Sequence, residues 1–356
     1  MGTLLVAAGG GGDAIAAAAL AGLAPEVPVG IATMAWDRLI VDPLPGPRAA
    51  TDFTELENRA GWRQVTSRSK PVAPAGSTLP RLAAEQPLPI VLLDPTRGAR
   101  GMRHDLEAAA VELGAQDIRL VDVGGDLLGQ PGDTGLRSPF ADALTAASCL
   151  GLSAMVWIAG PGLDGELSEE LVLQRARAAT AHKLRPQMWQ PYLPILRWHP
   201  SEATALLAAA TLGTRGTVEI RDAGLPVRLT EHSATVLELD MPALCAVNPL
   251  INSLAGTESL AEAEESAVRI LGRTELDSER AKAIQLERVP RVPDDLVTAV
   301  PPWEADLEAR GVDYVTYRRM AERFGYTDVH RFRTLIAERC PRRGTGLLWA
   351  VDARPE

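Results

Sequence analysis

The chain contains 356 residues, of which 46% are hydrophobic, and its formal net charge is −10. A chain of this length can bury a full core, in one large domain or in two smaller ones. The acidic balance argues against broad nucleic-acid binding, which needs a basic surface to neutralise phosphates. The three cysteines, Cys149, Cys245 and Cys340, are far apart and form no CxxC motif, so neither a disulfide framework nor a zinc knuckle is predicted.

No run of residues approaches the roughly 18 to 20 consecutive apolar residues that a membrane span needs. The first residues also lack the basic flank and the long apolar segment of a signal peptide. We therefore expect a cytoplasmic protein that has no membrane partner. The sequence leaves a monomer and a homo-oligomer both open.

Up to about residue 185, short apolar runs alternate with Ala- and Leu-rich runs, separated by Gly-, Asp- and Pro-rich breaks. Apolar strands that alternate with helices indicate a parallel sheet covered on both faces. The predicted fold class is therefore α/β, with a doubly wound, mostly parallel, Rossmann-like sheet. The predicted strands are Thr3–Ala8, Val27–Thr33, Pro89–Leu93, Ile118–Val123 and Ala154–Ala159, and the predicted helices are Asp13–Leu23, Arg100–Leu113, Pro139–Leu150 and Ser168–Ala181.

The pattern changes after this alternating region. Thr217–Leu239 holds three short β-rich pieces, which predict a hairpin or small meander added to the main domain. A Pro-rich segment then leads to two short amphipathic helices. We therefore divide the chain into an α/β domain (1–287), a Pro-rich linker (288–303) and a helical C-terminal extension (304–356). The extension resembles a helix-turn-helix in spacing, but we favour a helical pair packed on the main domain or on a partner.

The first predicted strand runs into four glycines, Gly9, Gly10, Gly11 and Gly12, followed by Asp13. Glycine permits a positive φ and lets backbone N–H groups approach a ligand at a helix N-terminus, where the partial positive charge favours an anion. We predict that the four glycines bind a phosphate or carboxylate and that Asp13 is a catalytic group. The alternative is that Asp13 only caps the helix.

The glycine loop also raises the question of a nucleotide ligand. The spacing of Gly9, Gly11 and Ala14 fits a dinucleotide-binding fingerprint, with Asp37 after the second strand as the partner of a ribose. No Walker A, GxSxG or HExxH motif is present, so P-loop, serine-hydrolase and zinc-protease chemistry are not predicted.

Acidic residues lie at the C-terminal end of each of the five predicted strands or in the loop after it. In an open parallel sheet, ligands bind beyond the C-terminal ends of the strands, so these acids are expected to face one edge of the sheet. They are Asp13, Asp37, Asp42, Asp94, Asp122, Asp126, Asp164 and Glu166.

Two of these loops, DVGGD and GPGLDGE, each carry two acids beside glycines. Carboxylate oxygens that converge, with water in the remaining positions, suit a hard divalent cation. We therefore predict a Mg²⁺ or Mn²⁺ site made by Asp126, Asp164 and Glu166, with Asp122, Asp126 and Asp164 also as catalytic groups. The alternative is that each acid is a helix cap or a turn residue.

Further ligand-binding residues are predicted beside the acids. Arg137 can grip a phosphate or carboxylate with two hydrogen bonds, and Ser138 precedes a proline at the start of a predicted helix. Arg38 follows Trp36 and Asp37 in the loop after the second strand. The loop glycines complete the predicted ligand site: Gly124, Gly125, Gly160 and Gly162.

Five longer motifs occur in order between residues 4 and 280: AGGGGDA, AWDRLIVDPLPGPR, VDVGGDLL, GLRSPFADAL and GPGLDGELS. In these motifs the chain resembles an archaeal and actinobacterial family catalogued as domain of unknown function 1152. The resemblance implies no established activity and assigns no catalytic residue.

These features predict a metal-assisted enzyme that acts on a small anionic metabolite: phosphorylated, nucleotide or carboxylate. The metal would polarise a substrate oxygen or activate water, and hydrolysis or elimination and phosphoryl or nucleotidyl transfer are all open. The alternative is a non-catalytic module that senses a nucleotide or metabolite and signals through its C-terminal helices.

Overall fold

A computed structural model describes residues 1–286, 296–339 and 346–351 of the chain. Within these residues the main sheet has nine strands, in the order β10-β13-β9-β8-β1-β2-β7-β5-β4. The five central strands, from β9 to β7, are parallel neighbours, and β13 and β5 join them in the antiparallel direction. The strands are β1 (Gly2–Ala7), β2 (Val27–Met34), β4 (Glu57–Asn58), β5 (Arg63–Val65), β7 (Ile90–Leu93), β8 (Ala115–Val123), β9 (Ala154–Ala159), β10 (Thr180–Lys183) and β13 (Thr235–Asp240).

The mostly parallel α/β sheet predicted from the sequence is confirmed, and the five predicted strands are its parallel block. Successive side chains of a strand point to opposite faces. In β1, Leu4 and Val6 pack in one buried cluster, and Leu5 and Ala7 pack in the other. Both faces of the sheet are therefore covered, which explains why its strands are continuous apolar runs.

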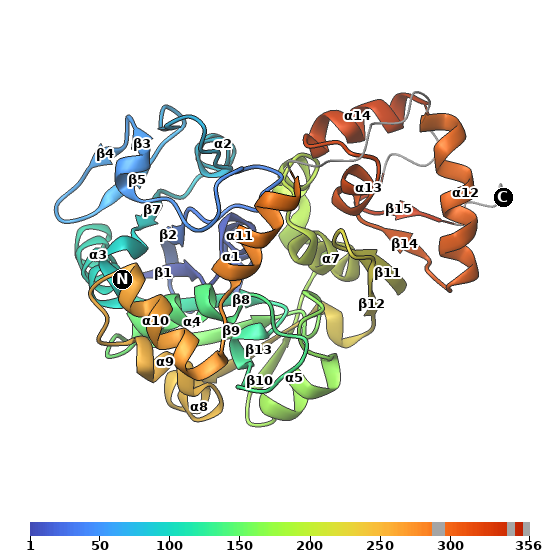
Figure 1. Cartoon of the computed structure of the whole chain (residues 1–356). Helices are drawn as coiled ribbons and strands as arrows, with labels where there is room; N and C mark the ends of the chain where they lie inside the picture. The colour runs from blue at the N-terminus through green and yellow to red at the C-terminus, as the bar shows by residue number, and fades with distance from the viewer. Residues whose placement is uncertain (287–295, 340–345, 352–356) are drawn as a thin grey trace.

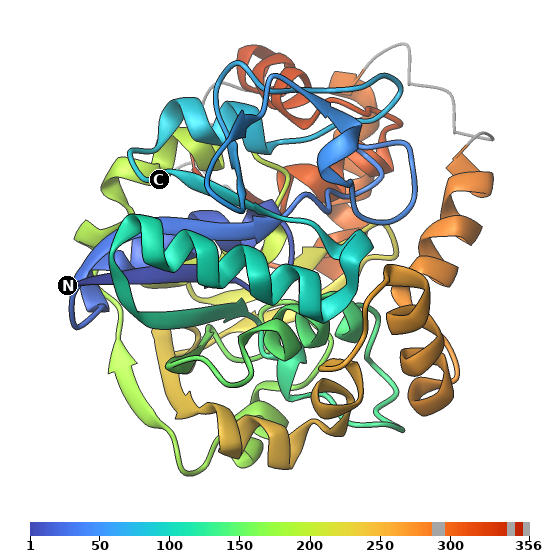
Figure 2. The same cartoon turned by 90° about the vertical axis from the view of Figure 1, so that its left-hand side faces the viewer.

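Helices lie on both faces of this sheet (Figure 1). One face packs on α1 (Gly11–Leu20), α2 (Leu79–Glu85) and α7 (Glu202–Thr211). The other face packs on α3 (Gly98–Leu113), which lies in front of the strands in Figure 2, and on α4 (Pro139–Cys149), α8 (Met241–Val247), α9 (Pro249–Leu254) and α10 (Leu260–Leu271).

The direction of the winding reverses at β1. The chain runs from β1 through β2 to β7, and then returns to the other side of β1 for β8 and β9. The helix after β1 is α1 and the helix after β8 is α4, and these two helices pack on opposite faces of the sheet. Open α/β sheets bind ligands at such a reversal point, beyond the C-terminal ends of the two diverging strands.

The β-rich segment 217–239 is divided between two sheets. β11 (Gly216–Ile220) and β12 (Leu225–Leu229) form the predicted hairpin, whereas β13 leaves it and pairs with β9 of the main sheet. The predicted helix Ser168–Ala181 is also shorter than expected. Its first half is α5 (Glu169–Arg175), and its end continues into β10, which pairs with β13.

Three further short elements belong to the main domain. β3 (Phe53–Thr54) and β6 (Lys70–Pro71) pair with each other, and α6 (Leu193–Leu196) precedes α7. No helix among the described residues is both long and apolar enough to cross a membrane.

Residues 296–303, predicted as part of the linker, are helical and begin α12 (Leu296–Ala309). The rest of the predicted linker, 288–295, lies outside the described residues. The helices expected in the extension are α13 (Tyr317–Arg323) and α14 (Val329–Arg339). We call the described residues from 296 onward the C-terminal unit.

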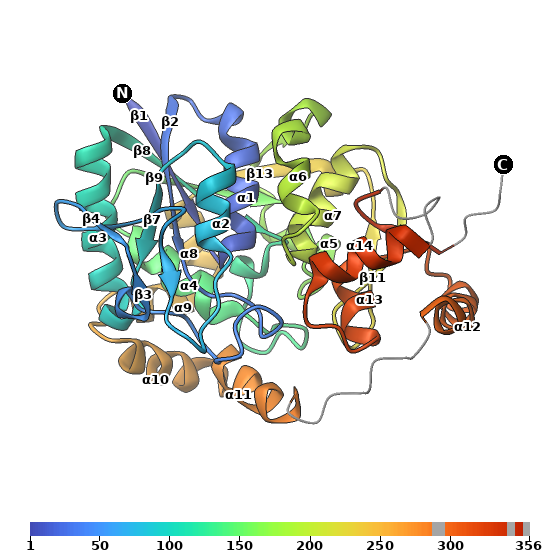
Figure 3. The ribbon, with the colours of Figure 1, turned by 90° about the horizontal axis from the view of Figure 1, so that it is seen from above.

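The C-terminal unit joins the main domain by strand pairing. β14 (Tyr314–Val315) runs parallel to β11, and β15 (Trp349–Ala350) pairs with β14. The result is a second sheet in the order β12-β11-β14-β15. In Figures 1 and 3 the unit lies beside α7 and this hairpin.

A buried ion pair crosses this junction and yields a stability prediction. Glu219 of β11 is fully buried and accepts hydrogen bonds from Arg319 (Nε, 2.7 Å) and from Arg310. Arg319→Met should lower the free energy of unfolding by about 3 kcal/mol, because a buried carboxylate loses one of its two cations. Denaturant unfolding measures this. The control is Arg331→Met at an exposed position, and equal stability of the two variants would contradict the prediction.

Candidate functional site

Six carboxyl groups converge at the C-terminal ends of β1, β8 and β9, and we call them the acidic cluster: Asp13, Asp122, Asp126, Asp142, Asp164 and Glu166. One carboxylate oxygen from each of Asp13, Asp122 and Asp142 lies within 4.8 Å of the others. Asp126, Asp164 and Glu166 meet the same limit. Five of the six are buried, and Asp13 is half-buried.

The reversal of the sheet at β1 explains this convergence. Asp13 lies in the first turn of α1 and Asp142 in the first turn of α4, so the two helices reach the cluster from opposite faces of the sheet. Asp122 is the last residue but one of β8, and Asp164 lies in the loop after β9. The positive ends of two helix dipoles therefore face the carboxyl groups, and this favours negative charge there.

Glu166 differs from the other five acids because donors surround its carboxylate. Oε2 accepts from the backbone N–H groups of Arg137 (2.5 Å) and Ser138 (2.9 Å), and Oε1 accepts from the Ser138 hydroxyl (2.5 Å) and from Arg221 Nη2 (2.8 Å). Burial opposes its ionisation, but the Arg221 guanidinium and these donors outweigh burial and hold the pKa of Glu166 below its usual range. Four donors fill the roughly four acceptor positions of a carboxylate.

The other five acids have raised pKa values, which favour their neutral, protonated forms. Burial, with repulsion from neighbouring carboxylates, raises the pKa of Asp122, Asp142 and Asp164 well above their usual range. Burial raises the pKa of Asp13 and of Asp126 to about 7. The Asp126 and Asp142 carboxyl groups lie close together, so a hydrogen bond between them would require one shared proton.

Two buried carboxylate oxygens of the acidic cluster have no hydrogen-bond donor among the described residues: Asp122 Oδ1 and Asp164 Oδ2. Their partner oxygens are used, since Asp122 Oδ2 accepts from the backbone N–H of Leu127 (3.2 Å) and Asp164 Oδ1 from that of Glu166 (2.9 Å). A buried oxygen without a partner is costly and calls for an explanation such as a bound ion. These two oxygens, with Asp13, Asp126 and Asp142, are the groups that could hold a divalent cation.

The four loop glycines pack against the protein's own atoms. A Cβ on Gly9 would lie 2.9 Å from a carboxylate oxygen of Asp142 and 3.0 Å from one of Asp13, and a Cβ on Gly10 would overlap the carbonyl oxygen of Trp36. A Cβ on Gly11 would meet Thr78 Oγ1 at 2.8 Å, and one on Gly12 would overlap Ser201.

None of the four glycines has a positive φ. Their shared property is that backbone and carboxyl groups approach them closely. The first turn of α1 nevertheless keeps donors free. The backbone N–H groups of Gly10, Gly11 and Gly12 have no acceptor among the described residues.

The glycines of the two acidic loops hold those loops together. Gly124 and Gly125 have φ values of 119° and 102°, and a Cβ on Gly124 would overlap the Asp164 carboxyl group. Gly160 and Gly162 also have positive φ, and the N–H of Gly162 donates to the carbonyl of Gly124 at 2.6 Å. These glycines therefore shape the cluster by bringing the loops after β8 and β9 into contact.

Three of the predicted acids do not join the cluster. Asp37 accepts from the hydroxyl (2.7 Å) and the N–H (3.0 Å) of Thr78, before α2. Asp42 pairs with Arg48 at 2.9 Å, and Asp94 accepts from the backbone N–H groups of Ala50 and Thr96. The carboxylate oxygens of these three residues therefore stabilise turns, caps and an ion pair.

The two predicted arginines are exposed, and each lies beside the cluster. Arg38 is near enough to Asp13 for its charge to favour the ionised carboxylate. Glu166 accepts hydrogen bonds from the backbone N–H of Arg137 and from the backbone N–H and hydroxyl of Ser138. Only the backbone of Arg137 takes part, so its exposed side chain is left for solvent or a ligand.

The site also contains residues that were not predicted. Glu275 of α11 (Glu275–Leu286) accepts from the N–H groups of Phe140 (3.0 Å) and Ala141 (2.6 Å), and so caps α4. Arg221 binds Glu166 from the β11–β12 turn. Both are distant from the acidic motifs in sequence, and no local pattern marks them. Asp142 differs from these two, because it lies with Arg137 and Ser138 in the GLRSPFADAL motif, although no role was assigned to it.

The fold and site define an α/β protein with a mostly parallel sheet and a buried carboxylate cluster where its winding reverses. The chain belongs to the family described as Protein of unknown function (DUF1152), whose model matches residues 4–283. This match confirms the family suggested by the motifs. It includes the whole acidic cluster, Glu275 and Arg221, and ends before the C-terminal unit. No curated protein and no solved structure matches the chain.

The packing of the loop glycines predicts a difference between two alanine variants. Gly10→Ala should destabilise the protein by roughly 1 to 3 kcal/mol, because the new Cβ overlaps a carbonyl oxygen that cannot move alone. Gly22→Ala should be nearly neutral, since no atom outside its immediate neighbours lies within 4 Å of that Cβ. Chemical denaturation measures the free energy of unfolding of both variants. Equal stability of Gly10→Ala and Gly22→Ala would contradict the steric overlap at Gly10.

Proposed function

We propose that the protein is a divalent-metal-assisted enzyme that acts on a small anionic metabolite. The observation that supports it best is the pair of buried, unpartnered oxygens, Asp122 Oδ1 and Asp164 Oδ2, within a cluster of mostly uncompensated carboxyl groups. A Mg²⁺ or Mn²⁺ ion would supply the charge that these groups lack, and its preference for carboxylate oxygen and water fits the donor set.

The ligands we propose are Asp122 and Asp164, with Asp126 beside them. Of the three ligands predicted from sequence, Glu166 is the poorest, because four hydrogen-bond donors already occupy its oxygens. Its role would be to fix the loop at Ser138.

The anionic group of the substrate would bind at the start of α1. Free N–H groups of Gly10, Gly11 and Gly12 and the positive end of the helix dipole favour an anion there. The exposed side chains of Arg38 and Arg137 would add charge. The parallel strands, numbered along the chain, have the Rossmann-like order 3-2-1-4-5, and this supports a nucleotide as one form of the ligand.

Asp13 is the proposed acid or base. Its pKa of about 7 lets it exchange a proton at neutral pH, and it is the most accessible member of the cluster. A bound metal would polarise a substrate oxygen or activate a water beside it. This chemistry serves hydrolysis, elimination and phosphoryl or nucleotidyl transfer.

A sensing module is the second candidate, and one observation favours it. Thr316 of the C-terminal unit donates a hydrogen bond to Glu202, and Glu202 accepts from the backbone of Arg221, which binds Glu166. A ligand at the cluster would thus be connected to the C-terminal helices. Saturable ligand binding without product formation, in the presence of Mg²⁺ or Mn²⁺, would support this candidate over the enzyme.

The metal proposal predicts the effect of asparagine substitutions. Mn²⁺ should raise the melting temperature of the wild-type protein, because an ion that binds only the folded state stabilises it. In Asp122→Asn and Asp164→Asn this shift should largely disappear, since a neutral amide is a poor ligand for a hard cation.

Thermal melts with and without Mn²⁺ measure these shifts. Asp240→Asn is the matched control, because Asp240 caps α8 and asparagine caps a helix about as well as aspartate. A wild-type melting temperature that does not respond to Mn²⁺ would refute the metal site.

The raised pKa values predict an effect of pH. An unfolded chain loses the Asp126 proton near pH 3.8, whereas the metal-free folded protein keeps it to about pH 7. The folded state binds more protons between these values, so the metal-free protein should lose stability as the pH rises through this window. Asp13 acts in the same direction.

Mn²⁺ must replace these protons, so its stabilising effect should be larger at pH 8 than at pH 5.5. Melting curves at both pH values, with and without Mn²⁺, measure the difference. Equal Mn²⁺ shifts at the two pH values would contradict proton displacement from the cluster.

A further inference from the structure

Arg221 has an unusual backbone conformation beside the acidic cluster. It lies in the turn between β11 and β12, with a φ of 60°. Residues other than glycine rarely adopt this left-handed conformation, and they keep it only where surrounding contacts fix it. Two sets of contacts do so here, one through the side chain and one through the backbone.

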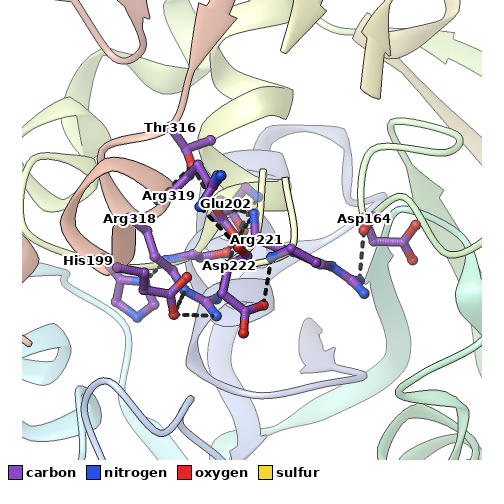
Figure 4. Close-up of polar contacts among 12 residues, drawn as sticks. Asp164, His199, Glu202, Arg221, Asp222, Thr316, Arg318 and Arg319 are labelled. Carbon is purple, nitrogen blue, oxygen red and sulfur yellow. Dashed lines mark hydrogen bonds and ion pairs between the residues drawn. The ribbon is translucent and has the colours of Figure 1, made fainter. Parts of the chain in front are cut away.

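The Arg221 side chain binds the loop that carries Asp164. Nη2 donates to the Asp164 carbonyl oxygen at 2.7 Å and to Glu166 Oε1 at 2.8 Å. Figure 4 shows the side chain extended from the hairpin turn toward Asp164. Glu166 in turn binds Ser138, directly before α4, and α4 carries Asp142. One guanidinium group therefore links the segments that position two of the carboxyl groups.

The Arg221 backbone is held by Glu202, the first residue of α7. The N–H of Arg221 donates to both carboxylate oxygens of Glu202, at 3.0 and 3.1 Å. Glu202 is buried, so the loss of these hydrogen bonds would not be replaced readily by water. The left-handed turn thus depends on the position of one carboxylate.

Glu202 is fixed from its other side by the C-terminal unit. The Thr316 hydroxyl donates to Glu202 Oε1 and accepts from the backbone N–H of Arg319 at 3.1 Å. Arg318 Nη1 lies 3.6 Å from Glu202 Oε2. Figure 4 shows these groups side by side. Thr316 is buried, and it caps α13 with the same hydroxyl that holds Glu202.

We propose that Arg221 is a positioning residue for the metal ligands, and that Thr316 of the C-terminal unit holds Arg221 in place through Glu202. This inference rests on the proposed metal site. Arg221 and Glu202 lie within the residues that the family model matches, and Thr316 lies beyond them. The C-terminal unit thereby sets the metal affinity of a cluster that it does not itself contribute to.

The test measures the affinity of the full chain for Mn²⁺ alone, by titration calorimetry or by the electron paramagnetic resonance of the free ion. Arg221→Asn removes the guanidinium and keeps a residue that tolerates a left-handed backbone. It should weaken Mn²⁺ binding by roughly 10- to 100-fold, as the loss of a group that orients metal ligands does. Thr316→Val removes one hydroxyl and should weaken binding by about 5-fold, at the lower end of coupling between sites.

Two variants control for general loss of structure. Thr316→Ser keeps the hydroxyl and should restore the wild-type affinity. Thr334→Val removes an exposed hydroxyl of the same unit, which donates only to its own helix, and should leave the affinity unchanged. A purely structural role for Thr316 would lower the melting temperature of Thr316→Val and leave its Mn²⁺ affinity as in the wild type.

Weaker Mn²⁺ binding in Arg221→Asn and Thr316→Val, with rescue by Thr316→Ser, supports the inference. Wild-type Mn²⁺ affinity in either Arg221→Asn or Thr316→Val overturns the inference. The proposed metal site would still stand after that result. A wild-type protein that binds no Mn²⁺ overturns the proposed function first, and this inference with it. If Arg221→Asn does not fold, the comparison of Thr316→Val with Thr316→Ser decides alone.

Discussion

Repulsion among buried carboxyl groups is the constraint on which the rest of the site depends. Six acids converge where the sheet reverses its winding, and Arg221 is the one cation that binds directly to a carboxylate among the described residues of the cluster. The folded protein meets this constraint in two ways. Glu166 is ionised by saturation with donors, and the other five acids are pushed toward their protonated forms. A divalent cation would exchange those protons for two positive charges at once, so the same repulsion that disfavours the ionised metal-free cluster favours metal binding.

The close approach of the carboxyl groups explains why glycine occurs in the loops of the acidic cluster. Gly9 leaves space for the carboxyl groups of Asp13 and Asp142, and Gly124 does so for Asp164. A side chain at either position would push apart the groups that the cluster brings together. The glycine-rich loop therefore owes its composition first to the protein's own atoms. Its free N–H groups at the start of α1 are then available beside the acids, which places the proposed anion and the proposed metal next to each other.

The sequence predicted the layers of the fold well, because buried parallel strands and the helices that cover them leave strong local patterns. The prediction failed where the choice of strand partner decided the fold. The sequence of β13 has an alternating pattern typical of a hairpin, yet β13 pairs with β9. Among the residues of the acidic cluster, Asp13, Asp126, Asp164 and Glu166 were singled out because each follows a strand, and Asp122 because it lies near the C-terminal end of β8. Asp37, Asp42 and Asp94 follow strands too, and only their partners, such as Thr78 and Arg48, reveal that they serve turns and ion pairs. Glu275 and Arg221 reach the site from distant segments, which no local pattern could indicate.

The contacts of Arg221 also bear on why the C-terminal unit joins the main domain through β11. The turn that follows β11 carries Arg221, and the strand that pairs with β11 is followed directly by Thr316. Strand pairing therefore fixes the distance between the two ends of the Thr316–Glu202–Arg221 chain of hydrogen bonds. A unit attached only by a flexible linker could not hold a buried carboxylate in one position, because each hydrogen bond would have to offset the entropy of ordering the linker. The backbone hydrogen bonds between β11 and β14 already order this part of the chain. The hydroxyl of Thr316 then needs only to complete the last contact to Glu202.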